Sequence, residues 1–98
     1  MIIRIVKMTF RPELTNEFIN FFEDYKLQIR NFPGCSYLQI LQDLNFPNII
    51  FSYSHWESES DLDNYRKSEV FKSVWPRTKA LFLEDPLAWS TVVLQDLI

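Results

Sequence analysis

The chain is predicted to be a single α+β domain of the ferredoxin-like type, a four-stranded antiparallel sheet with its helices on one face. Segments with the patterns of strands and helices follow one another in the order strand, helix, strand, strand, helix, strand, which is the split βαβ arrangement. The 98 residues, 47% hydrophobic and 23% charged, are enough for one hydrophobic core. We therefore expect one domain over residues 1–98.

The first half of the chain predicts a strand and then a long helix. Residues 2–10 are apolar and rich in β-branched side chains, which is typical of a strand. From 13 to 31, apolar residues recur at spacings of three and four, which predicts an amphipathic helix. Thr15 or Asn16 is expected to cap its start, and Pro33-Gly34 is expected to end it.

A β-hairpin is predicted next. Residues 35–43 and 49–57 are both rich in β-branched and aromatic side chains. The segment 44–48 between them contains two Asn residues and a Pro, which is typical of a turn.

The last part predicts two helical segments and a strand. Ser58 with the carboxylates that follow it is typical of a helix start, and this short helix is expected to reach about Arg66. Ser68 is expected to cap a second helical segment that continues to residue 82, with Pro76 kinking or dividing it. The final strand is expected over 89–97.

The predicted sheet is apolar on both faces. In the first strand, Ile3 and Ile5 lie on one face, while Val6, Met8 and Phe10 lie on the other. Helices can cover only one face, and water against the other would be costly. We therefore expect a homodimer that packs two sheet faces together. The alternative is a monomer with ordinary exposed apolar residues.

Charge and composition exclude several classes of protein. The net charge of −3 argues against nucleic-acid binding, which needs a basic surface. No segment approaches the roughly 18 apolar residues that a membrane helix requires, and the charged N-terminal segment is unlike a signal peptide. Cys35 is the only cysteine and His55 the only histidine, so we expect no disulfide and no metal site. We expect a cytoplasmic protein.

Several motifs resemble those of one family. The chain begins with IIRIVKMTF, has FPGC before its second strand, and carries Trp56-Glu57-Ser58 followed by Ser68 and Phe71 in the form W-E-S, helix, S-x-x-F. These segments resemble the antibiotic biosynthesis monooxygenase-like family of dimeric α+β barrels. The resemblance implies a cofactor-independent monooxygenase that oxidises a small aromatic or quinol-type substrate in an apolar pocket between sheet and helices. The alternative is a non-catalytic dimeric module that binds a hydrophobic small molecule.

The haem-degrading branch of that family fits less well. Its members carry a proximal histidine four residues after the Phe of S-x-V-F-K and a tryptophan three residues before the Ser. Here those positions hold Trp75 and Tyr65, and the first strand lacks the asparagine of that branch. Since indole does not ligate iron as imidazole does, we expect no haem.

Two candidates for catalysis stand out, His55 and Tyr65. Histidine is the residue type most often used as a general base near neutral pH, so His55 could take a phenolic proton, or it could be a half-exposed strand residue without a role. Tyr65 and Trp75 could donate hydrogen bonds to a substrate oxygen, or they could belong to the core.

Three further side chains are candidates for substrate binding. Ser52, Ser54 and Trp56 share one face of the third strand, so they could line a cavity, or they could be rim and core residues. The same alternation turns His55 to the opposite face from Trp56. Arg66 and Arg77, in the helical segments after them, could pair with an acidic ligand or be solvated.

Overall fold

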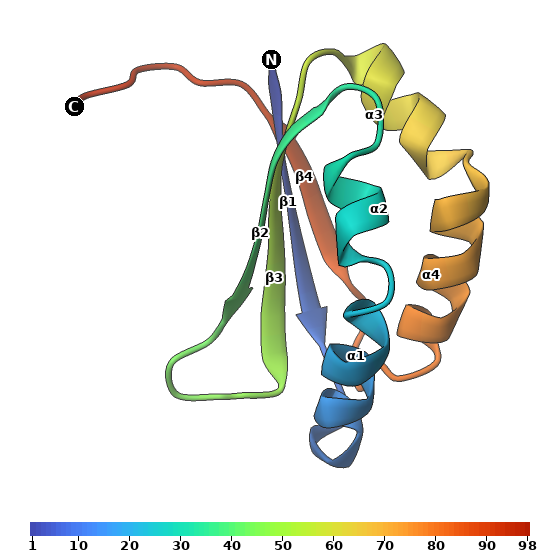
Figure 1. Ribbon diagram of the computed structural model, residues 1–98. Coiled ribbons are helices and arrows are strands. Elements are labelled where there is room, and N and C mark those ends of the chain that lie inside the picture. The colour runs from blue at the N-terminus through green and yellow to red at the C-terminus, as the bar shows by residue number, and fades with distance from the viewer.

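The protein is described by a computed structural model that covers residues 1–98. One antiparallel sheet in the order β2-β3-β1-β4 carries all the helices on one side (Figure 1). This is the predicted ferredoxin-like α+β fold. In chain order the elements are β1 (Ile2–Thr9), the 3-10 helix η1 (Pro12–Leu14), α1 (Thr15–Phe22), α2 (Lys26–Arg30), β2 (Cys35–Gln42), β3 (Ile49–Trp56), α3 (Glu59–Arg66), α4 (Glu69–Lys79) and β4 (Leu87–Thr91).

The main core lies between the sheet and the helices. Phe10 is fully buried just after β1, and its ring stacks on Phe18 of α1 with the ring centroids 4.5 Å apart. Burying such apolar side chains is the dominant favourable term in folding. The buried residues of this core are Met8, Phe10, Phe18, Phe21, Ile29, Ile50, Val74 and Leu81.

The prediction of one continuous helix over 13–31 is wrong. The segment is divided into η1, α1 and α2. The break between α1 and α2 arises because the amides of Asp24 and Tyr25 bond to carbonyls three residues back instead of four. The tighter turn still leaves Tyr25 edge-on against Phe21, at 6.4 Å between ring centroids. The apolar spacing that predicts one helix therefore survives across the break. No side chain caps η1 or α1, so the predicted capping by Thr15 or Asn16 is also wrong.

The final strand is shorter and earlier than predicted. β4 pairs only with β1, and its last residue, Thr91, lies opposite Ile3. Almost nothing of β1 remains beyond that point, so the segment 92–98 has no strand to bond to. In Figure 1 this segment runs away from the body of the protein.

The two serine caps are confirmed. Ser58 Oγ accepts a hydrogen bond from the amide of Asp61 at 3.1 Å, and Ser68 Oγ accepts one from the amide of Phe71 at 3.2 Å. Pro76 lies inside α4 without dividing it, so of the two predicted effects division does not occur.

The connection from α2 to β2 depends on Gly34. Its φ of +91° lies in the region that glycine tolerates best. A Cβ atom there would also come within 2.4 Å of the Cβ and Cγ atoms of Asp61 in α3. The single glycine of the chain thus lets this connection approach the start of α3.

No helix covers the second face of the sheet (Figure 1). We call this surface the open face. It is largely apolar and aromatic, and Lys7 is its one residue that carries a permanent charge. Among the helices on the other side, none has the length and hydrophobicity that spanning a bilayer requires. By alternation and register, the open face consists of Ile3, Ile5, Lys7, Tyr37, Gln39, Leu41, Phe51, Tyr53, His55, Leu87, Trp89 and Thr91.

Candidate functional site

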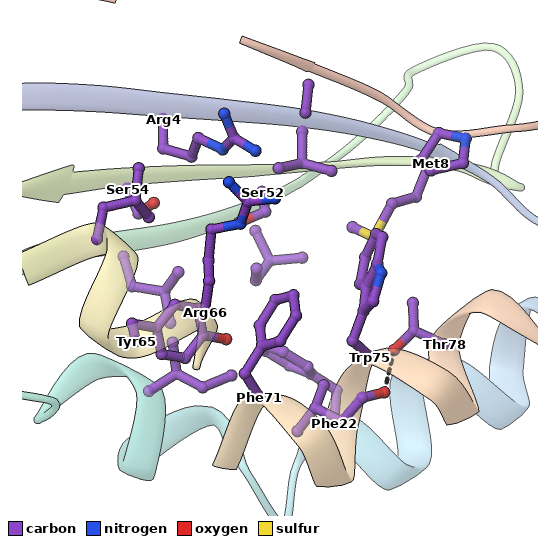
Figure 2. Close-up of a pocket in the computed structure, with 18 of the residues that line it drawn as sticks. Arg4, Met8, Phe22, Ser52, Ser54, Tyr65, Arg66, Phe71, Trp75 and Thr78 are labelled. Atoms are coloured by element: carbon purple, nitrogen blue, oxygen red, sulfur yellow. Dashed lines mark hydrogen bonds between the residues drawn. The ribbon is translucent and has the colours of Figure 1, made fainter. Parts of the chain in front are cut away.

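A cavity of about 230 Å³ lies between the sheet and the helices, and 14 of its 20 lining residues are hydrophobic. Figure 2 shows most of these side chains converging from β1, β3, α3 and α4. The lining residues Arg66 and Ala88 are exposed, so the cavity opens to solvent beside them. Its mostly apolar wall is suited to a molecule with an apolar body.

The register of the sheet gives the cavity a polar end. Arg4 of β1 lies between Ser54 of β3 and Ser90 of β4, and its Nη1 donates a hydrogen bond to Ser90 Oγ at 2.9 Å. In the next row on the same face, Ser52 lies opposite Val6. Two neighbouring rows of the sheet thus bring one guanidinium and three hydroxyls to the helix-covered face.

The other end of the cavity is apolar. One row further along β1 the polar residues are replaced by Met8, opposite Ile50. Trp75 also lines the cavity and packs against the core that contains Met8, and its ring stacks on Phe71, with centroids 5.7 Å apart. The cavity therefore has a polar end and an aromatic end.

Trp56 forms a wall of the cavity. It is only 1% exposed, its Nε1 donates a hydrogen bond to Ser54 Oγ at 2.9 Å, and its ring stacks on that of Tyr65 at 5.0 Å. The Ser54 hydroxyl is thus already engaged, whereas the Ser52 hydroxyl, which also lines the cavity, bonds to no group of the protein.

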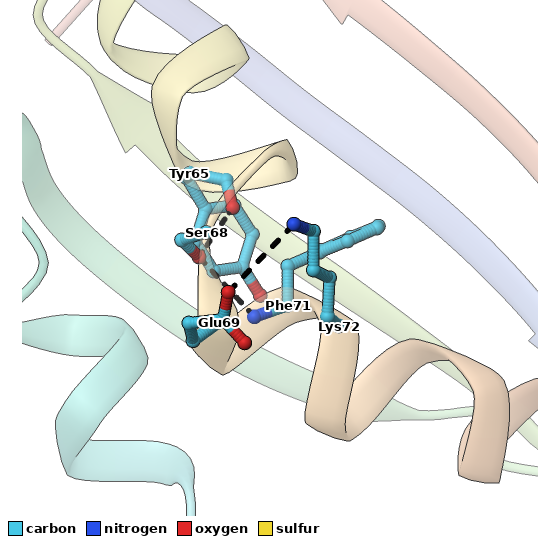
Figure 3. A network of polar contacts seen from close by, with 5 residues as sticks. All are labelled: Tyr65, Ser68, Glu69, Phe71 and Lys72. Atoms are coloured by element: carbon cyan, nitrogen blue, oxygen red, sulfur yellow. Dashed lines mark hydrogen bonds and ion pairs between the residues drawn. The ribbon is translucent and has the colours of Figure 1, made fainter.

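The junction of α3 and α4 positions two lining residues (Figure 3). Ser68 Oγ donates a hydrogen bond to the carbonyl oxygen of Tyr65 at 2.6 Å and caps α4 at the amide of Phe71. Outside it, Lys72 and Glu69 form an exposed ion pair at 3.7 Å. One serine therefore fixes Tyr65 and Phe71 relative to each other.

The Tyr65 phenol stays protonated in this environment. Burial, with a smaller contribution from Cys35, raises its pKa far above the ordinary value of 10.0. No group of the protein hydrogen-bonds to its hydroxyl, which is free to donate a hydrogen bond to a bound molecule. Tyr65 is thus suited to donating a hydrogen bond and unsuited to acting as a base.

Five of the six predicted site residues line this one cavity. His55 does not. It lies on the open face, where its Nε2 is 3.2 Å from the Tyr53 hydroxyl and its ring is 5.0 Å from that of Tyr37. A base at this position cannot reach a molecule in the cavity. The five that line it are Ser52, Ser54, Trp56, Tyr65 and Trp75.

The sequence marks Arg4 as a charge inside a strand that would need a partner if a dimer buried it, but does not place it in the cavity, whose wall it lines. The signal was present, since a charge in the middle of an apolar strand needs a reason. Of the helical arginines, Arg66 lines the cavity, whereas Arg77 lies over the ring of Phe21 at 4.3 Å, outside the lining. No three side chains of His, Cys, Asp or Glu come together as a metal-ligand set.

Comparison with known proteins supports the fold over the whole chain. The family model described as antibiotic biosynthesis monooxygenase matches residues 1–75. A crystal structure of an antibiotic biosynthesis monooxygenase is similar with a TM-score of 0.91 and 18% identity, over 97% of this chain and 100% of that one. No curated protein matches the chain.

Two further solved structures are similar. A conserved protein from Methanosarcina mazei has a TM-score of 0.86 and 25% identity, over 93% of this chain and 91% of that one. The protein Rv0793 from Mycobacterium tuberculosis has a TM-score of 0.88 and 14% identity, over 97% of this chain and 96% of that one.

Proposed function

The chain belongs to the antibiotic biosynthesis monooxygenase family, and from this premise we propose that it is a cofactor-independent monooxygenase that oxidises a small aromatic, quinol-type substrate in the cavity between sheet and helices. The observation that carries the proposal is the apolar cavity itself, with hydrogen-bond donors in its wall. An engineered cavity of roughly 150 Å³ binds benzene, so a volume of about 230 Å³ suits a body of one or two rings.

The chemistry asks the protein mainly for a dry, shaped cavity. An electron-rich phenol loses its proton, and the anion passes one electron to dioxygen. The substrate radical and superoxide then join in a carbon–oxygen bond, and loss of water completes the reaction. For a hydroquinone, the balanced products are a hydroxyquinone and water: the substrate supplies four electrons, one oxygen atom enters the product and the other leaves as water. Exclusion of solvent keeps the intermediates from side reactions.

Two hydrogen-bond donors of the cavity have a part in this scheme. Tyr65 donates a hydrogen bond to a substrate oxygen, because its raised pKa keeps its proton on the phenol. The Nε1–H of Trp75, which bonds to no group of the protein, is a second donor. No Asp, Glu or His lines the cavity, so the first substrate proton leaves to solvent at the open side.

Oxygen uptake tests the proposal. We expect one- and two-ring hydroquinones to consume oxygen above the buffer rate, with one atom of isotopically labelled dioxygen in the product. Ala88→Phe places a ring in the open side of the cavity and should abolish uptake. Ala80→Phe makes the same change at an exposed position outside the lining and should not. An uptake equal to buffer, or an Ala88→Phe protein as active as the parent, contradicts the proposal.

The second candidate function is a non-catalytic module that binds a hydrophobic small molecule. The absence of any titratable base from the cavity lining favours it. Oxygen uptake together with a titration of hydroquinone binding separates the two functions. A protein that binds hydroquinones in the cavity, yet leaves their oxidation at the buffer rate, is a binding module.

For the assembly, we propose a homodimer that packs two copies together through the open face. Phe51 and Tyr53 contribute aromatic surface at the centre of this face, and Leu87 and Trp89 are about half exposed at its edge. A second copy is the partner of matching chemistry, because an apolar face with almost no charge is complementary to itself.

We also propose the cytoplasm as the location. The chain has a single cysteine, Cys35, whose thiol is buried and free. Burial raises the pKa of this thiol, which makes it unreactive. A lone thiol of this kind is suited to a reducing compartment.

A further inference from the structure

The two guanidinium groups of the cavity lie at the same end. Arg4 extends from the central strand β1, and Arg66 reaches from α3 toward the sheet (Figure 2). Burial of Arg4 is the main cause that lowers the pKa of its guanidinium, and the nearby positive charge of Arg66 lowers it further. The fold therefore brings two like charges together beside an apolar space.

Neither guanidinium has a counter-charge. The two ion pairs of the structure, Lys26–Glu23 and Lys72–Glu69, involve other residues. None of the 20 residues that line the cavity is an Asp or a Glu, although acidic residues outnumber basic ones in the chain. Arg4 has the Ser90 hydroxyl as its only side-chain partner. Two cations of this kind, one of them half-buried, are stabilised when an anion binds between them.

We propose that the molecule bound in this cavity is an aromatic carboxylate, with its carboxylate held by Arg4 and Arg66 and its one- or two-ring body in the apolar end. The forked donors of a guanidinium match the two oxygens of a carboxylate. The unpartnered hydroxyl of Ser52 lies in the row next to Arg4 and adds a further donor. The proposal names the substrate class of the site, and it rests on the proposed function only for the reaction that follows binding.

Isothermal titration with three naphthalene probes tests the head group: naphthoate, naphthamide and naphthylmethylammonium, which share one ring body and differ in charge. We expect the protein to bind naphthoate roughly tenfold or more tightly than the neutral amide, and the ammonium probe most weakly of the three. Equal affinity for naphthoate and naphthamide, or no binding of either, overturns the proposal.

Arg66→Gln is the main variant, because Arg66 is exposed and its replacement does not threaten the fold. It should remove most of the preference for naphthoate while leaving the affinity for naphthamide within about twofold. Arg66→Lys, which keeps the charge, should restore part of the preference. Arg4→Gln combined with Arg66→Gln should remove the preference entirely.

Lys67→Gln is the matched control. It removes one positive charge from the next residue, which is also exposed but does not line the cavity. It should leave the naphthoate affinity unchanged. If it weakens naphthoate binding as much as Arg66→Gln does, the net charge of the protein governs affinity and the proposal falls.

Failure of this proposal and failure of the proposed function are distinguishable. A protein that prefers naphthoate but oxidises no hydroquinone retains the carboxylate site and loses the oxygenase function. A protein that oxidises a neutral naphthohydroquinone as fast as its carboxylated form retains the function and loses the carboxylate site.

Discussion

Two parts of one side chain, the ring and the hydroxyl of Tyr65, have separate roles. The ring packs against Trp56, Phe32 and Phe71, with centroids 5.0, 5.4 and 5.3 Å away. The hydroxyl has no partner in the protein. Stability therefore depends on the ring, and the proposed hydrogen bond to substrate depends on the hydroxyl.

Tyr65→Phe separates these roles. The free energy of unfolding should change by less than about 0.5 kcal/mol, since no hydrogen bond is lost and the ring remains. The rate of hydroquinone oxidation should fall by about 100-fold, the scale of a positioned proton or hydrogen-bond donor. Chemical denaturation and oxygen uptake measure the two quantities. A variant with full activity removes Tyr65 from the reaction.

The same phenol makes stability depend on alkaline pH. Folding raises the pKa of Tyr65 above its ordinary value of 10.0, so the folded protein keeps a proton that the unfolded chain loses. The contribution is complete below pH 10.0 and is lost as the pH rises above it, at about 1.4 kcal/mol per pH unit for one proton. Denaturation measured at a series of pH values above 10.0 should show this slope. In Tyr65→Phe the free energy of unfolding should fall less steeply with pH, by the amount that corresponds to one proton. Equal slopes in the parent and the variant would contradict the assignment to Tyr65.

At the scale of elements, Gly34 lies between α2 and β2 and also contacts the start of α3. Its carbonyl oxygen accepts a hydrogen bond from the amide of Glu57 at 2.9 Å, just after β3, and its missing side chain leaves room for Asp61 of α3. The end of α2, the start of β2 and the start of α3 therefore meet at one residue.

Gly34→Ala should destabilise the protein by about 2 kcal/mol or more, because the positive φ and the contact with Asp61 are both unfavourable for alanine. Thermal or chemical denaturation measures the loss. Adding Asp61→Gly removes both the Cβ and the Cγ atoms that make the contact but leaves the φ unchanged, so the double variant should lose less than the sum of the two single variants. Additive losses would show that Asp61 does not limit the space.

The elements also show what sequence pattern can and cannot predict. Alternation along β3 correctly put Trp56 and His55 on opposite faces, because the strand period is two. The break between α1 and α2 was missed, because the apolar spacing continues across it through Tyr25. The end of β4 was missed because strand length depends on how much of β1 is left to pair with. Alternation is local to one segment, whereas the length of β4 depends on the neighbouring strand β1.

For the whole molecule, the open face predicts association. Trp89→Glu puts a charge on this face at a side chain that is 46% exposed, so an isolated protomer should tolerate it. The parent protein should sediment as a dimer at micromolar concentration, and Trp89→Glu as a single protomer.

Leu83→Glu is the control for this experiment. Leu83 is 56% exposed and lies outside the sheet, so the same kind of change should leave the dimer intact. A parent protein that sediments as one protomer contradicts the dimer.

The composition of the cavity was partly predictable at this scale. Five of its side chains were predicted from the two-sided pattern of β3 and from the aromatic residues of α3 and α4. The meeting of Arg4 and Arg66 was not, because it depends on how α3 packs on the sheet and the two residues are some 60 positions apart in the chain. Sequence pattern predicts the face on which a residue lies, and the packing of helix on sheet determines its partner.

The three tryptophans of the chain lie in different surroundings. Trp56 and Trp75 line the cavity, whereas Trp89 belongs to the open face. Their fluorescence should therefore respond to different events, with the first two sensing occupancy of the cavity and the third sensing the approach of a second copy. Replacing Trp89 with phenylalanine would leave an emission spectrum that reports on the cavity alone, without any attached dye.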